Sequence, residues 1–86
     1  MKTIHKFPLK PTGQQTVKMP NNAIIRHVGE QDGNLFLWAQ VVDRNEPEDR
    51  LIEVYGTGHE VNEYDLDFIG TVQMANGLVF HVFENK

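Results

Sequence analysis

The sequence has no cysteine, only one tryptophan and no hydrophobic run of about 18 residues. The absence of cysteine excludes a disulfide framework and a cysteine-ligated zinc site. Without a long apolar run, no segment is expected to cross a membrane as a helix. The first residues carry charge but no apolar core of a signal peptide, so we expect a cytoplasmic protein.

The chain is also short, and its 86 residues are expected to form one domain, 1–86. A domain of this size buries only roughly 60–65% of the surface that its unfolded chain exposes, so its stability is small. Small domains without disulfides or metals often gain further burial by self-association. We therefore expect a homo-oligomer.

The apolar residues favour sheet over helix. Valine, isoleucine and threonine number 19, against six leucines and three alanines, and β-branched side chains pack well on a pleated surface. Short apolar-rich runs recur between turn signals. The predicted strands are 2–9, 15–19, 23–30, 35–43, 50–55, 68–74 and 78–84. The fold class is therefore all-β, a small antiparallel sandwich or barrel of about seven short strands.

Turn signals predict two hairpins. Gly33, after Asp32, can adopt positive φ, and Asn76-Gly77 is the strongest short hairpin signal in the chain. We expect residues 44–49, with Pro47, to form a polar loop. Residues 59–67 are polar and acidic and could hold one short helical turn.

The most apolar predicted strand, 35–43, is hydrophobic on both faces. Leu35, Leu37, Ala39 and Val41 share one face, and Phe36, Trp38, Gln40 and Val42 share the other. Loops around a closed barrel could cover the second face, and so could a second subunit. We expect the second subunit, because 86 residues supply little covering material.

Charge is segregated along the chain. Residues 1–26 contain five cations and no acid, a net charge of +5, whereas residues 27–86 contain three cations and all 12 acids, a net charge of −9. Three interpretations stay open: cross-strand pairing within one chain, complementarity between subunits, and a local positive site for an anionic ligand. The overall charge of −4 argues against a binder of duplex nucleic acid.

The glycine-rich segment Gly56-Thr57-Gly58-His59 follows a predicted strand. Its glycines could point successive N–H groups at an anion. It lacks the Gly-Lys-Ser/Thr ending of a P-loop and the third glycine of a dinucleotide fingerprint. It is therefore either an anion-binding turn or a plain turn.

The histidines and acidic residues carry little chemical signal. Metal binding by His5, His27, His59 or His81 would need convergence that spacing does not show. Pairing of His59 with Glu60 or Glu63 is a weak catalytic hypothesis. Glu63, Asp65 and Asp67 lack the spacing of an EF-hand. We expect no enzyme, no catalytic residue, no metal and no cofactor.

Several segments together resemble a family of short proteins of unassigned function encoded by bacteriophages and prophages. The segments are 1–9, 37–39 (Leu-Trp-Ala), 56–59 (Gly-Thr-Gly-His), 68–71 (Phe-Ile-Gly-Thr) and 78–84 (Leu-Val-Phe-His-Val-Phe-Glu). The resemblance implies a phage origin and a location in the host cytoplasm. It supplies no catalytic residues.

In that setting we expect a non-catalytic counter-defence protein that sequesters a small anionic, cyclic-nucleotide-like host immune signal between identical subunits. The candidate ligand-binding residues are Lys2, Lys6, Arg26, Trp38, Tyr55, Gly56, Thr57, Gly58 and His59. One alternative is an inhibitor that binds a host protein directly. Another is a minor structural or regulatory phage protein.

Overall fold

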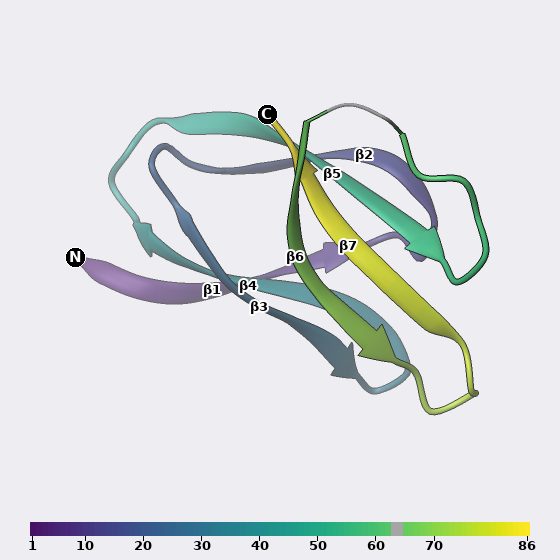
Figure 1. Cartoon of the computed structure of the whole chain (residues 1–86). Helices are drawn as coiled ribbons and strands as arrows, with labels where there is room; N and C mark the ends of the chain where they lie inside the picture. Colours follow the sequence, from purple (N-terminus) through teal and green to yellow (C-terminus); the bar gives the residue numbers. More distant parts are fainter. Residues whose placement is uncertain (63–64) are drawn as a thin grey trace.

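The structure, a computed structural model, describes residues 1–62 and 65–86 and is all-β. Its strands are β1 (Lys2–Leu9), β2 (Gly13–Pro20), β3 (Ile24–Gln31), β4 (Asn34–Val42), β5 (Pro47–Gly56), β6 (Leu66–Gln73) and β7 (Val79–Asn85) (Figure 1). Sheet A has the order β1-β4-β3, and sheet B has the order β2-β5-β7-β6. All pairs are antiparallel. The fold class predicted from the sequence is thus confirmed as a sandwich-like arrangement that is not closed into a barrel.

Strand β4 is the centre of sheet A. Its odd-numbered residues Leu35, Leu37, Ala39 and Val41 are at most 2% exposed and point into the space between the sheets. Ile52, Val54 and Val82 of sheet B meet them there and are equally buried. The even-numbered residues of β4 are half-buried on the outer face of sheet A, as strict alternation requires.

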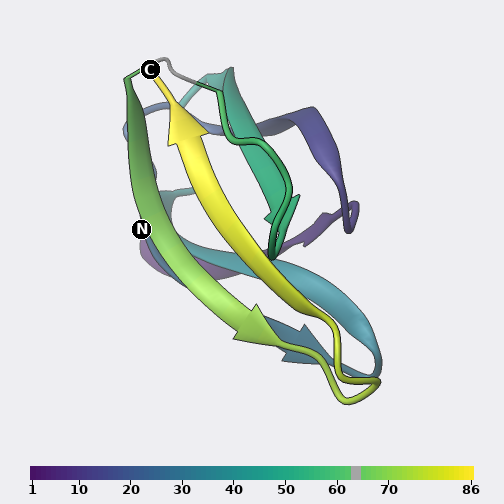
Figure 2. The ribbon, with the colours of Figure 1, turned by 45° about the vertical axis from the view of Figure 1, so that its right-hand side comes forward.

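The two sheets approach closely on one side only. Strand β3 packs against β6, where a Cβ on Gly70 would lie 2.9 Å from Val28 Cγ2, so this contact needs glycine. The tips of the β3–β4 and β6–β7 hairpins lie side by side in both views (Figures 1 and 2), and Ala75 N–H donates to Glu30 Oε1 at 2.6 Å. On the other side a groove of about 730 Å³ separates the unpaired edges of β1 and β2.

Both predicted hairpins are confirmed. Asp32 and Gly33 both have positive φ, 53° and 81°, as a two-residue type I′ turn requires. In the second hairpin only Gly77 has positive φ, at 92°, and its N–H donates to Met74 O at 3.0 Å. That hairpin therefore has a three-residue loop in place of a two-residue turn.

The predicted loop 44–49 is wrong in its second half, because β5 begins at Pro47. Pro47 lies opposite Pro20 at the end of the β2–β5 ladder, where neither ring nitrogen is needed as a donor. Lys18 then pairs with Asp49 at 3.0 Å across the same ladder. The polar residues form strand because their side chains lie on an edge pair open to water.

The acidic segment 59–67 contains no helical residue in its described part. Glu63, which the sequence analysis paired with His59 and grouped with Asp65 and Asp67, lies outside the described residues. Within the described ranges, 1–62 and 65–86, no helix has the length and apolar character needed to span a membrane.

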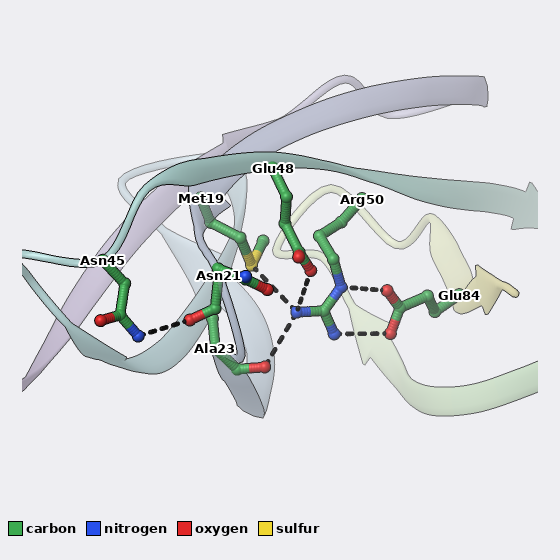
Figure 3. A network of polar contacts seen from close by, with 7 residues as sticks. All are labelled: Met19, Asn21, Ala23, Asn45, Glu48, Arg50 and Glu84. Atoms are coloured by element: carbon green, nitrogen blue, oxygen red, sulfur yellow. Dashed lines mark hydrogen bonds and ion pairs between the residues drawn. The ribbon is translucent and has the colours of Figure 1, made fainter.

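An ion pair closes one end of the core (Figure 3). Arg50 binds both carboxylate oxygens of Glu84, with Nη2 2.9 Å from Oε1 and Nε donating to Oε2. Arg50 Nη1 donates to Ala23 O at 2.8 Å. The hydrogen bond to Glu84 raises the pKa of Arg50 above its ordinary value. Arg50 thereby ties β5 to β7 and to the start of β3.

Candidate functional site

The outer face of sheet A gathers cations and aromatic rings. Alternation and register place nine side chains on it, which we call the basic face: Lys2, Ile4, Lys6, Ile24, Arg26, His27, Phe36, Trp38 and Gln40. Sheet A is described throughout, and no outward-facing position of its three strands carries a carboxylate. Four of the predicted ligand-binding residues, Lys2, Lys6, Arg26 and Trp38, lie on this face.

The cations of the basic face bind neutral amides. Lys6 Nζ donates to Gln31 Oε1 at 2.7 Å, and Arg26 donates to Gln40 Oε1 from Nε at 3.1 Å and from Nη2 at 2.8 Å. No ion pair between residues that the structure describes involves Lys2, Lys6 or Arg26. A neutral partner orients a cation without cancelling its charge, so the face keeps a positive potential.

Lys18 is different. Its ion pair with Asp49 is the cross-strand pairing that the sequence analysis considered. The basic N-terminal segment is therefore partly paired within the chain, at Lys18. Its remaining charge is concentrated on the outer face of sheet A.

The aromatic side chains of the basic face form one row. The centroids of Phe36 and Trp38 are 6.0 Å apart along β4, and the His27 ring lies 5.7 Å from Trp38. Lys6 Nζ lies 4.5 Å from the centre of the Phe36 ring, within cation–π distance. The row offers flat surfaces for stacking beside charges that attract anions.

A β-bulge in β3 turns two side chains to this face. The register with β4 shifts between Ile25 and His27. Arg26 and His27, consecutive in sequence, consequently both reach the basic face, while Val28 points into the core. Bulges often re-aim side chains in this way beside functional sites.

Gly29 lies directly below these rings. A Cβ at Gly29 would lie 3.0 Å from His27 Nε2 and 3.5 Å from Trp38 Cζ3. The glycine therefore lets both rings lean toward β3. A side chain there would have to move His27.

Carboxylates limit the basic face at both ends. Asp43 follows Val42, whose partner in the ladder is Lys2, and its Oδ1 lies 3.4 Å from the N-terminal amino group. Exposed Asp32 occupies the turn between β3 and β4. Lys2 and Lys6 span four residues of strand, about 13 Å. The positive stretch has room for only a few phosphates.

The other five predicted residues, 55–59, lie on sheet B at the end of β5 and do not join the first four within one chain. His59 N–H donates to Gly56 O at 3.1 Å, and Gly58 has φ of 89°. The Thr57 hydroxyl is 2.9 Å from Nε2 of His81. The hydrogen-bonding groups of this turn are thus used within the protein, which favours a plain turn.

A cavity of about 480 Å³ lies between this turn and the β6–β7 hairpin. It is lined by Gly56, Thr57, His59, Gly77, Leu78, Val79 and Phe80. Its polar side chains are His59 and Thr57, and Thr57 is bonded to His81. No cation lines it, so it lacks the charge that an anion site needs.

The outer face of sheet B contains a closed carboxylate. Glu53 is 0% exposed and accepts hydrogen bonds from four side chains. The donors are Tyr55 Oη, Asn62 Nδ2 at 2.8 Å, Asn85 Nδ2 at 2.8 Å and Gln14 Nε2 at 3.3 Å. Burial opposes the charge of Glu53, but the four hydrogen bonds together hold its pKa below the ordinary value. Burial and the bond to Glu53 raise the pKa of Tyr55. Tyr55 therefore serves this carboxylate.

Sequence reasoning missed His27, Phe36, Gln40 and Gly29 as parts of the basic face. Alternation had placed Phe36 and Gln40 beside Trp38, and that signal was sufficient to find them. The bulge that brings in His27 leaves no periodic signal. The role of Gly29 depends on which neighbouring rings lean over it.

The described residues contain no cluster of three or more His, Asp or Glu side chains arranged to hold a metal ion. A comparison with curated proteins finds no match to the chain, and neither does a comparison with solved structures. A scan of protein families does find one, described as a domain of unknown function (DUF7352), which matches residues 1–86. Because the match covers the whole sequence, the chain belongs to the DUF7352 family.

Proposed function

We propose that this protein binds a compact anionic nucleotide on the basic face and performs no catalysis on it. The observation that carries the proposal is the combination on one sheet face of Lys6 and Arg26, bonded only to neutral amides, with the rings of Phe36 and Trp38. Cations recognise phosphate, and aromatic rings stack on bases. Neither feature alone would select a nucleotide.

The ends of the basic face favour a compact ligand over a long strand. A polyanion that continued past Val42 would approach Asp43, and one that continued past Gln31 would approach Asp32. Like charges repel, so binding energy would stop growing with ligand length. A ligand with one to three phosphates fits within these limits.

The resemblance to phage-encoded proteins extends the proposal to a biological role. A phage protein that holds a cyclic nucleotide tightly would lower its free concentration in the host cytoplasm. Such sequestration needs affinity and copy number but no chemistry. We propose that this is a counter-defence role against a host immune signal.

Trp38 gives a direct assay because it is the only tryptophan in the chain. Adenine and guanine nucleotides, including cyclic forms, are titrated while its fluorescence is followed. We expect quenching that saturates and weakens with added salt. Adenosine without phosphate and inorganic phosphate without a base should each bind at least tenfold more weakly, since each satisfies half of the site. Equal binding of inorganic phosphate would contradict a nucleotide site.

A matched pair of variants locates the site. Arg26→Gln removes one cation from the basic face, and we expect about tenfold weaker binding, about 1.4 kcal/mol. Lys18→Gln removes the same charge from the Lys18–Asp49 pair on sheet B and should leave affinity within about twofold. Equal effects of the two variants would show that only net charge matters. Recovery of an unaltered nucleotide after heating would exclude turnover.

A second candidate function rests on the groove between β1 and β2. Phe7, Leu9 and Val17 line it together with Lys10 and Lys18, and both bordering strands have an unpaired edge. Such an edge can add a strand from another protein. An inhibitor of a host protein would lose its partner on Lys10→Glu, in nuclease-treated lysate, and keep it on Arg26→Gln. The opposite pattern would favour the nucleotide site.

A further inference from the structure

We propose that two copies of this chain close face to face on a single cyclic dinucleotide, so that each copy supplies half of the binding site. This inference rests on the proposed function and adds to it the ligand class and the stoichiometry. It is argued from the shape, the exposed apolar groups and the charge of the basic face.

The shape of the molecule leaves the basic face open. The chain is a thin slab, with extents of 39 × 31 × 15 Å, and the face is one broad side of a three-stranded sheet. The three grooves of the described structure lie at sheet edges and at a turn, and only Ile24 and Arg26 of the basic face border one of them. Small-molecule sites normally enclose 70–90% of the ligand, by general estimates of about that size. A flat face contacts one side only, so a second wall is required.

Two exposed isoleucines support a protein wall. Ile4 and Ile24 lie on opposite sides of Gln40 in one cross-strand row and are 52% and 48% exposed. They border the Arg26 guanidinium, which is bonded to Gln40. An apolar pair beside a cation site gains burial when a second surface closes over the bound anion. A second copy of the same face supplies matching isoleucines.

Charge explains why closure would need the ligand. Each face carries Lys2, Lys6 and Arg26 with no carboxylate between them. Two such faces repel each other when empty. An anion placed between them contacts both sets of cations, so association and binding stabilise each other. The protein alone is therefore expected to be monomeric.

Symmetry selects the ligand class. Two identical faces that meet do so about a twofold axis. A cyclic dinucleotide with two identical bases has the same symmetry, with two bases for two Trp38 rings and two phosphates for two sets of cations. A mononucleotide on the axis would leave one Trp38 ring without a base.

The test is analytical ultracentrifugation of the whole chain, with cyclic di-AMP and cyclic di-GMP as probes and AMP and linear pApA as comparisons. We expect a monomer without nucleotide and a dimer at half an equivalent of a cyclic probe. Excess probe should return loaded monomers, since each face then holds its own ligand. AMP should bind, if at all, without forming dimers.

A matched pair of variants identifies the interface. Ile4→Ser and Leu78→Ser each remove an exposed apolar side chain, 52% and 55% exposed. Ile4→Ser should weaken dimer formation at least fivefold while Trp38 quenching persists, and Leu78→Ser on the other sheet should change neither. Circular dichroism checks that both variants fold.

The outcomes separate the two proposals. Saturable 1:1 binding to a monomer at every ratio would overturn the shared site and leave the proposed function intact, and so would tight 1:1 binding of pApA alone. A dimer that forms without nucleotide, or one lost on Leu78→Ser, would overturn the closure. Absence of any nucleotide binding would overturn both proposals.

Discussion

The two outer faces of the sandwich both hold charged groups bonded to neutral side chains, but only one is closed to water. On sheet B, Glu53 is 0% exposed, and Asn62 from the loop after β5 covers it. On sheet A, Lys6 and Arg26 are exposed, and each is bound by one glutamine amide.

The difference separates a structural charge from an available one. Glu53 accepts four hydrogen bonds, so little capacity is left for an external group. Arg26 uses two of its five N–H groups on Gln40, and no other hydrogen bond among the described residues uses the rest. Charge that is exposed and only partly bonded is where a ligand gains most. The predictions below test this contrast.

The largest loss of stability is expected from breaking the buried ion pair between the faces. Arg50→Met leaves Glu84 and the Ala23 carbonyl without their donor, and should lower the free energy of unfolding by about 3–5 kcal/mol. Urea denaturation measures this. Replacing both partners, as Arg50→Met with Glu84→Leu, should restore part of the loss because no unpaired charge remains. A single variant as stable as the wild type would contradict this account.

A smaller loss is expected on the closed face. Glu53→Gln replaces a charged acceptor facing four donors, at a cost of about 2–3 kcal/mol at pH 7. The folded-state pKa of Glu53 is lowered, so its stabilising effect is complete above its unfolded pKa of about 4.3 and is lost as the pH falls through the folded-state value. The gap between wild type and variant in urea should therefore close on acidification below about pH 4. A gap that widened there would reverse the assigned sign.

The glycine-rich turn should behave as a structural turn. Gly58 has φ of 89° with open space around its Cβ position, so Gly58→Ala should cost about 1 kcal/mol through backbone strain alone. Thermal unfolding measures the cost. Nucleotide affinity on the basic face should stay unchanged, and a large loss of affinity would return the turn to the binding site.

The smallest change in stability is expected on the open face. Lys6→Gln and Arg26→Gln should each alter the free energy of unfolding by less than about 0.5 kcal/mol, because both side chains are exposed and unpaired with acids among the described residues. Both should still weaken nucleotide binding in calorimetry. Destabilisation as large as that of Glu53→Gln would remove the distinction between the faces.

Sequence patterns predicted most of this fold because they follow local rules. Alternation from Leu35 to Val42 separated the core side of β4 from its outer side, and Asp32-Gly33 defined a turn. The strand at Pro47 was missed because its residues are polar and its stability comes from pairing with β2. Pairing across 27 or more residues, such as Pro20 with Pro47, has no local signal.

The candidate site was predicted only in part for the same reason. Charge segregation indicated Lys2, Lys6 and Arg26, and these residues do share a face. It did not indicate that residues 55–59 lie on the other sheet, since strand order decides that. Trp38 joined the right group because it lies on the central strand of sheet A.

The order of strands also bears on how the chain folds during synthesis. Strand β1 has β4 as its ladder partner and β2 has β5, so neither finds a partner until the ribosome has made residues more than 25 positions further on. Such non-local pairing places folding in the range of about milliseconds to seconds. The cationic first 26 residues therefore emerge as an unpaired tail, and the acidic remainder of the chain is the nearest surface to which they can be attracted while they wait.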